Sequence, residues 1–125
     1  GSEEAMPGVL VVDDEPDVIE FLSYNFKQRG YETESALNGM DGIAKVNDFD
    51  PDVIIADIMM PVMDGIGMCK VLKCDERHKH IPVIFLSAVQ DDYCVMNAAM
   101  SGDDFISKPV KFSTLLAMAE KYLRV

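Results

Sequence analysis

The chain has 125 residues, of which 49% are hydrophobic and 26% charged. This length is typical of one domain, and this apolar content is too high for a disordered chain. The sequence also lacks the uninterrupted run of about 20 apolar residues that a membrane span needs, so we expect a soluble globular domain. The 22 acidic and 11 basic side chains give a net charge of −11. This charge disfavours nucleic acid and anionic membranes as ligands and favours cations or basic partners, although it could equally serve solubility alone.

Three cysteines, Cys69, Cys74 and Cys94, lack CxxC spacing, and no secretory signal precedes the first apolar run. This pattern predicts reduced thiols in a cytoplasmic protein. Gly1 and Ser2 resemble a cloning scar, which predicts that the chain was taken from a longer protein.

Three short runs of β-branched and apolar residues have no apolar/polar alternation, namely residues 9–12, 53–56 and 81–86. Such runs predict strands that are buried on both faces of a sheet. Two weaker strand candidates are the alternating stretch 31–36 and the short run 104–107. We therefore expect five strands.

Segments with helical periodicity alternate with these strands. The clearest begins near Pro16, a residue that suits the first turn of a helix, and ends at Gly30, which suits its end. Four further helices are marked by apolar residues at helical spacing: Ile43 and Val46; Met68, Val71 and Leu72; Met96, Ala99 and Met100; and Phe112, Leu115, Leu116, Ala119 and Leu123. Five strand and helix pairs predict an α/β fold, (βα)5, with helices on both faces of a five-stranded parallel sheet, because crossovers between parallel strands are right-handed.

Polar residues stand where the predicted strands end. Asp13 and Asp14 follow the first strand, Asp57 the third and Ser87 the fourth, and Lys108 comes just after the fifth. Ligands of an open parallel sheet bind beyond the carboxyl ends of its strands. We expect three carboxylates, a hydroxyl and an ammonium group to converge there.

The three aspartates would repel one another. Two unit charges about 4 Å apart cost roughly 1 kcal/mol in bulk water and about 4 kcal/mol at an effective dielectric constant of 20. A bound cation would relieve this cost. Oxygen ligands with room for water and a phosphate oxygen suit Mg2+, and Mn2+ would fit the same ligands.

Each of these residues also has an ordinary structural interpretation. Asp13 and Asp14 precede a helix, where Asp is a favoured N-cap, and capping and a site role are equally supported for this pair. Asp57 could be a loop aspartate, Ser87 another N-cap, and Lys108 a solvated surface lysine. Independent capping does not explain why all of them fall at strand ends.

Four motifs resemble those of the response-regulator receiver domains, typified by the chemotaxis receiver: VVDDEP at 11–16, DIMMPVMDG at 57–65, PVIFLSA at 82–88 and FISKP at 105–109. The likeness covers about residues 8–124, within a domain of residues 3–125. It implies a flavodoxin-like, doubly wound sheet with strand order 2-1-3-4-5. It also implies a place in two-component signalling or a phosphorelay.

The resemblance implies that Asp57 is the phosphoacceptor and also a metal ligand. Asp13 and Asp14 would hold Mg2+ directly or through water, and the backbone carbonyl of Met59 would be a further ligand. A carboxylate that attacks phosphorus needs its own charge and that of the phosphoryl group neutralised, which a metal and a lysine can do.

The resemblance also implies that Lys108 and Ser87 contact oxygens of the phosphoryl group. A cis peptide bond between Lys108 and Pro109 would aim the lysine inward; cis is cheap only before proline, although trans is the commoner state. Phe105 would be a switch residue that turns inward when Ser87 moves toward the phosphate. The alternative for Phe105 is ordinary core packing.

By this resemblance the domain is a signalling switch, which catalyses only its own phosphotransfer and autodephosphorylation. A sensor histidine kinase would supply the phosphoryl group from a phosphohistidine. The fourth helix, fifth strand and fifth helix, at residues 90–124, would control a partner or an output domain outside this chain. The resemblance is closest to receivers attached to winged-helix DNA-binding domains, which implies an output domain of that kind. A homodimer through that face is a hypothesis, because the fifth helix region offers few cations: Lys111, Lys121 and Arg124.

Met59 and Val89 are both apolar and lie two residues beyond Asp57 and Ser87. Family experience implies that side chains at these positions help or hinder the attacking water, so we expect a comparatively long-lived phosphoprotein.

Two other functions compete with a receiver. An aspartate-nucleophile phosphatase generally has a second aspartate where this chain has Met59, and a scaffold that is never phosphorylated tends to lose one of the acidic or lysine positions.

His78 and His80 lie in a charged stretch between the third helix and the fourth strand. We expect a surface loop there and no metal site.

Overall fold

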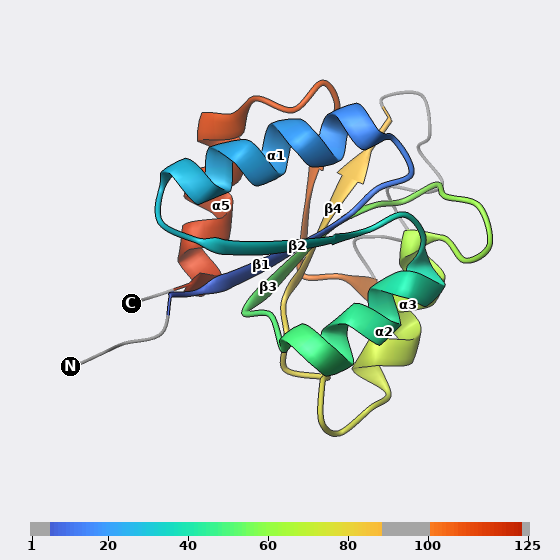
Figure 1. Ribbon diagram of the computed structural model, residues 1–125. Helices are drawn as coiled ribbons and strands as arrows, with labels where there is room; N and C mark the ends of the chain where they lie inside the picture. Colours follow the sequence, from blue (N-terminus) through green and yellow to red (C-terminus); the bar gives the residue numbers. More distant parts are fainter. Residues whose placement is uncertain (1–5, 89–100, 124–125) are drawn as a thin grey trace.

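A computed structural model of the chain describes residues 6–88 and 101–123. Strands and helices follow one another as the sequence predicts, and Figure 1 shows their arrangement. The elements are β1 (Gly8–Val12), α1 (Pro16–Gln28), β2 (Glu32–Ala36), α2 (Gly39–Phe49), β3 (Val53–Asp57), α3 (Gly65–Lys73), β4 (Val83–Ser87), β5 (Asp104–Ser107) and α5 (Phe112–Leu123). The helix predicted around Met96, and with it Val89 and Cys94, lies outside the described residues.

The five strands form one sheet in the order β2-β1-β3-β4-β5, and each neighbouring pair is parallel. The predicted α/β fold and strand order are confirmed. Helices α1 and α5 cover one face of the sheet, and α2 and α3 cover the other (Figure 1). Among residues 6–88 and 101–123, no helix is long and apolar enough to cross a bilayer.

The three central strands β1, β3 and β4 are buried along their whole length, which confirms the interpretation of their unbroken apolar runs. The edge strands β2 and β5 show alternating exposure, because successive side chains of a strand point to opposite faces of the sheet. Alternate residues of the central strands point to opposite faces, so two hydrophobic cores form. One packs against α2 and α3, and the other against α1 and α5.

Helix α1 starts at Pro16 and ends at Gln28, followed by Gly30 with φ of +91°. Its N-cap residue is Glu15, which makes no side-chain capping hydrogen bond. The interpretation of Asp13 or Asp14 as the N-cap is therefore wrong, although Asp13 Oδ1 accepts a hydrogen bond from the Glu15 N–H at 2.9 Å.

The turn between α3 and β4 differs from the predicted surface loop at one residue. His78 is buried, and its Nδ1 lies 3.4 Å from Oδ2 of Asp75, whereas His80 is exposed. Backbone hydrogen bonds from His78 N–H to the Asp75 carbonyl and from Ile81 N–H to the His78 carbonyl close the turn. The charged composition of this stretch did not predict that His78 would be buried.

Candidate functional site

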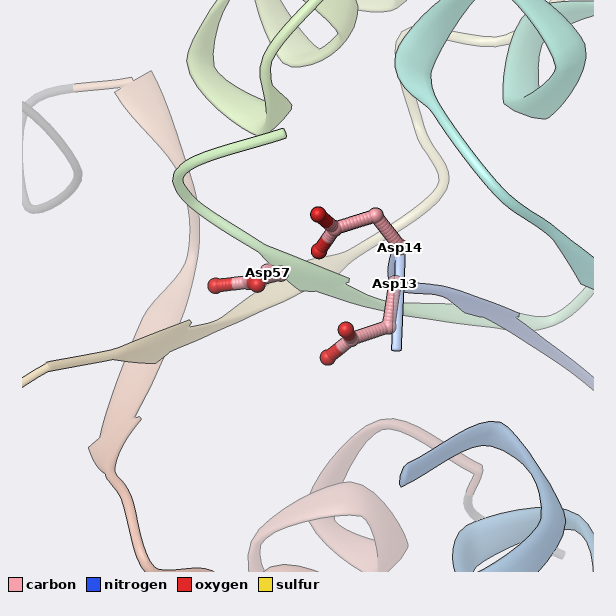
Figure 2. Close-up of side chains that lie close together, drawn as sticks. All are labelled: Asp13, Asp14 and Asp57. Carbon is pink, nitrogen blue, oxygen red and sulfur yellow. The ribbon is translucent and has the colours of Figure 1, made fainter. Parts of the chain in front are cut away.

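Three carboxylates lie together at the carboxyl end of the sheet. Asp13 and Asp14 follow β1 and Asp57 ends β3, and these two strands are paired in parallel. A carboxylate oxygen from each can be chosen so that all three lie within 4.8 Å of one another. Figure 2 shows the three side chains extending to the same side of the strand ends. Asp13 is fully buried, Asp57 is 9% exposed, and Asp14 is exposed.

The start of α3 fixes the backbone behind Asp57. The N–H of Gly65 donates to the Ile58 carbonyl at 2.9 Å, and a Cβ atom at Gly65 would lie 2.1 Å from the Asp57 carbonyl oxygen. Only glycine permits so close an approach. Beside it, Asp64 caps α3 by accepting a hydrogen bond from the N–H of Gly67 at 2.7 Å.

Lys108 reaches this cluster from the segment after β5. Its Nζ donates to Asp57 Oδ2 at 3.2 Å and lies 3.3 Å from Asp13 Oδ2 and 3.6 Å from Glu15 Oε1. Its backbone N–H donates to the Ser87 carbonyl at 2.8 Å, and the Lys108–Pro109 peptide bond is cis, as the family resemblance implies. The alternative of a solvated surface lysine is therefore wrong.

The charges in the site are not balanced. Burial raises the pKa of Asp57 to about 6, repulsion by Asp13 adds to the rise, and the Lys108 ammonium opposes it. Burial also raises the pKa of Asp13, against the hydrogen bond from the Glu15 N–H and the pull of Lys108. The pKa of Lys108 is itself raised, because the attraction of Asp57 and Asp13 outweighs the opposite effect of burial. One ammonium group thus neutralises only part of the negative charge of several carboxylates, and the site favours a further cation.

Two polar atoms of the site lack a hydrogen bond within the described part of the chain. They are Ser87 Oγ, at the carboxyl end of β4, and Asp13 Oδ2, whose contact with Lys108 has the distance of an ion pair without hydrogen-bond geometry. Ser87 is 1% exposed. Buried polar atoms are usually satisfied, so the Asp13 oxygen is suited to a cation and the Ser87 hydroxyl is suited to donating to an anion.

Phe105, on the edge strand β5, is 36% exposed. It does not pack in the core, so the ordinary-packing interpretation of this residue is wrong for this structure.

The sequence prediction had no role for Glu15, which the structure places 3.6 Å from Lys108. Its position directly after two aspartates was the available signal.

The described site combines three carboxylates, an ammonium group and a free hydroxyl at one edge of a parallel sheet. Such an acidic cluster could hold a metal ion. A family model described as "response regulator receiver domain" matches residues 9–120 of the chain. The chain belongs to this family.

Relatives of this receiver domain include DNA-binding regulators. The DNA-binding dual master transcriptional regulator RpaA of Synechocystis is 35% identical over 120 residues, which cover 95% of this chain and 50% of RpaA. This chain spans about half the length of the curated relatives it matches. Another relative, the DNA-binding response regulator MtrA of Mycolicibacterium smegmatis, is 34% identical over 117 residues, which cover 93% of this chain and 50% of MtrA.

Solved structures of similar fold include a receiver domain and a chemotaxis protein. The signal receiver domain of a histidine kinase from Syntrophus aciditrophicus is 36% identical with a TM-score of 0.87, and the match covers 94% of this chain and 89% of that one. The chemotaxis protein CheY4 of Vibrio cholerae is 31% identical with a TM-score of 0.87, and the match covers 95% and 100% of the two chains. The family resemblance is confirmed. Receiver domains act as signalling switches in response regulators of two-component systems.

Proposed function

We propose that this receiver domain takes a phosphoryl group from the phosphohistidine of a sensor histidine kinase onto Asp57, with Mg2+ as cofactor. One observation carries the proposal: a single ammonium group, Lys108 Nζ, lies 3.2 and 3.3 Å from oxygens of Asp57 and Asp13 within a cluster of three carboxylates. The arrangement holds positive charge where a phosphoryl group on Asp57 would place new negative charge.

The metal would be held by Asp13, Asp14 and Asp57, with the backbone carbonyl of Met59 as a further ligand. The donor set fits Mg2+, because it is made of oxygens and one carboxylate is exposed, which leaves room for water. Mn2+ would fit the same ligands. When bound, the metal supplies positive charge that lets an anionic carboxylate approach an anionic phosphoryl group.

The side chains then have separate tasks. Asp57, with a pKa of about 6, is mostly ionised at neutral pH and can attack phosphorus. Lys108 pairs with one oxygen of the phosphoryl group, and Ser87 Oγ, which has no partner in the described part of the chain, donates to another. Phe105 turns inward as Ser87 moves.

Such contacts are strong enough to work a switch. Moving a two-state equilibrium from about 1:99 to 99:1 needs about 5.5 kcal/mol. Two to four hydrogen bonds to a charged group, at roughly 1.5–3 kcal/mol each, would supply it.

The phosphorylated state would be read at residues 90–124, of which β5 and α5 are described. The readout controls a partner or an output domain, for which we propose a winged-helix DNA-binding domain because relatives of the chain are DNA-binding regulators. We place the protein in the cytoplasm, with no direct nucleic-acid or membrane binding by this domain.

The test is incubation with Mg2+ and acetyl phosphate, followed by intact-mass measurement over time. We expect one added phosphoryl group, which is lost over minutes or longer because Met59 is apolar and orients no water. The adduct should be absent without Mg2+ and in Asp57→Asn, and present in Asp48→Asn, a matched control at an exposed aspartate.

Other outcomes would contradict this proposal in distinct ways. No adduct under any condition would indicate a scaffold, and turnover of unrelated phosphate esters would indicate a phosphatase. Loss of the phosphoryl group within seconds would refute the long lifetime alone.

A further inference from the structure

We propose that Glu15 is a specificity-determining residue for the phosphodonor. Its carboxylate at the edge of the site favours donors whose leaving atom is positively charged in the intact donor over donors whose leaving group departs as an anion. The inference rests on the proposed phosphotransfer to Asp57. It concerns a residue that the expected site does not include.

The backbone holds Glu15 firmly in place. Pro16 disfavours a helical conformation of the residue before it, and Glu15 is extended, with φ −99° and ψ 112°. The Glu15 N–H donates to Asp13 Oδ1 at 2.9 Å, and its carbonyl accepts hydrogen bonds from the N–H groups of Val18 and Ile19. The backbone from which the side chain extends is therefore set by the same Asp13 that lines the site.

The side chain of Glu15 ends beside Lys108. Oε1 lies 3.6 Å from Nζ, and the same Nζ contacts Asp57. The Glu15 side chain is 63% exposed, whereas that of Lys108 is 25% exposed. A donor that brings its phosphoryl group to Asp57 and Lys108 thus passes an exposed negative charge.

A cavity of about 520 Å³ adjoins Lys108 on this side, between the start of α1 and the segment after β5. Glu15 and Asp17 supply its carboxylates, and apolar residues form most of its wall, among them Val18, Phe21 and Val110. The cavity gives space for the part of a donor beyond its phosphoryl group. Glu15 is the acid of this cavity that also contacts Lys108.

Two small phosphodonors, acetyl phosphate and phosphoramidate, can reveal the effect of this charge because their leaving atoms differ in charge. With acetyl phosphate, an oxygen of Asp57 forms the new P–O bond while the P–O bond to the acetyl group breaks and its electron pair leaves on acetate. With phosphoramidate, the nitrogen is protonated and positive in the donor; the P–N bond breaks and nitrogen leaves as ammonia. The Glu15 carboxylate repels the acetate that develops from the first donor and attracts the protonated nitrogen of the second donor while it is still bonded to phosphorus. The imidazole of a phosphohistidine, once protonated, belongs to the second class.

Glu15 also attracts Lys108, and removal of its charge would free the ammonium to interact more strongly with any phosphoryl group. That effect is the same for both donors. The ratio of the two rates therefore reports the specificity role, and a change in both rates by one factor reports only the contact with Lys108.

The experiment measures the rate of adduct formation by intact mass with each donor, in Mg2+, for the unmodified chain, Glu15→Gln, Glu15→Asp and Asp17→Asn. Glu15→Gln should shift the rate ratio toward acetyl phosphate by a factor of about three to ten, as expected for a unit charge several ångströms away in a largely aqueous setting. Glu15→Asp keeps the charge and should restore most of the preference. Asp17→Asn should leave the ratio within about twofold. The shift should shrink at 0.5 M NaCl, because exposed charges are screened.

Each other result decides against the inference. An unchanged ratio in Glu15→Gln, or an equal shift in Asp17→Asn, overturns the assignment to Glu15 while the proposed function stands. Absence of an adduct with both donors in the unmodified chain overturns the proposed function and this inference with it. Glu15→Gln keeps the backbone contacts, and circular dichroism checks that every variant is folded.

Discussion

The fold makes ionisation of the Asp57 carboxyl group less favourable. Its pKa of about 6, raised mainly by burial and then by Asp13, means that ionisation is harder in the folded than in the unfolded protein. Lys108 offsets part of this cost at 3.2 Å. A group with a raised folded-state pKa stabilises the fold fully below its unfolded pKa and loses that contribution as pH rises through its folded pKa.

We therefore predict that Asp57→Asn makes the metal-free protein more stable at pH 7, by roughly 1–3 kcal/mol in free energy of unfolding. The gap between the variant and the unmodified chain should open as pH rises from about 4 to about 6. Urea unfolding at a series of pH values, in EDTA, measures it. A gap that is constant over this range would show that Asp57 ionises as easily in the folded chain as in the unfolded one.

The loop between β3 and α3 is the element that sets the geometry around Asp57. Val62 has φ of +70°, an unfavourable value for a β-branched residue. The N–H of Met63 donates to the Pro61 carbonyl at 2.7 Å, and the Met63 carbonyl accepts the N–H of Gly39, the first residue of α2, at 2.8 Å. The loop is thus hydrogen-bonded to α2 through Met63, and it packs closely against the backbone of Asp57 at Gly65.

We predict that Gly65→Ala destabilises the chain by about 3 kcal/mol or more, because its Cβ would stand 2.1 Å from the Asp57 carbonyl oxygen and the backbone must move. Gly67→Ala is the matched control in the same turn of α3. Its Cβ would meet side-chain atoms at 3.3 Å, so it should change stability by about 1 kcal/mol or less. Thermal and urea unfolding compare the two, and equal effects would contradict the close approach at Gly65.

At the scale of the whole molecule, a net charge of −11 opposes self-association. Charges expected at a dimer face are also partly used within the chain. Lys121 lies 3.4 Å from Asp104, and Asp103 pairs with Lys73 at 2.9 Å. Dimerisation through α5, β5 and the segment before β5 thus has to compete with these internal ion pairs.

We expect, as a hypothesis, that a phosphoryl mimic with Mg2+ converts the domain from monomer to dimer by repacking this face. Light scattering at a series of protein concentrations measures the mass, and Asp57→Asn is the control that should stay monomeric. A monomer mass with and without the mimic would remove the hypothesis.

Much of the fold could be predicted from local patterns. The unbroken apolar runs of β1, β3 and β4 indicated burial on both faces, and Pro16 and Gly30 marked the ends of α1. The residues at the strand ends followed from register alone, since parallel strands bring Asp13 and Asp57 to one edge. The motifs around them identified the family.

Only the tertiary structure decided how these groups interact. Lys108 and Asp57 are 51 residues apart, and no local pattern states that one ammonium group contacts Asp57, Asp13 and Glu15 together. The pKa of Asp57 depends on burial by distant elements, and the inward turn of His78 depends on the packing of its loop. Sequence by itself determined which chemical groups stand at the strand ends, because strand periodicity is local. Distances, burial and shared charge were decided by packing, because they depend on segments far apart in the chain.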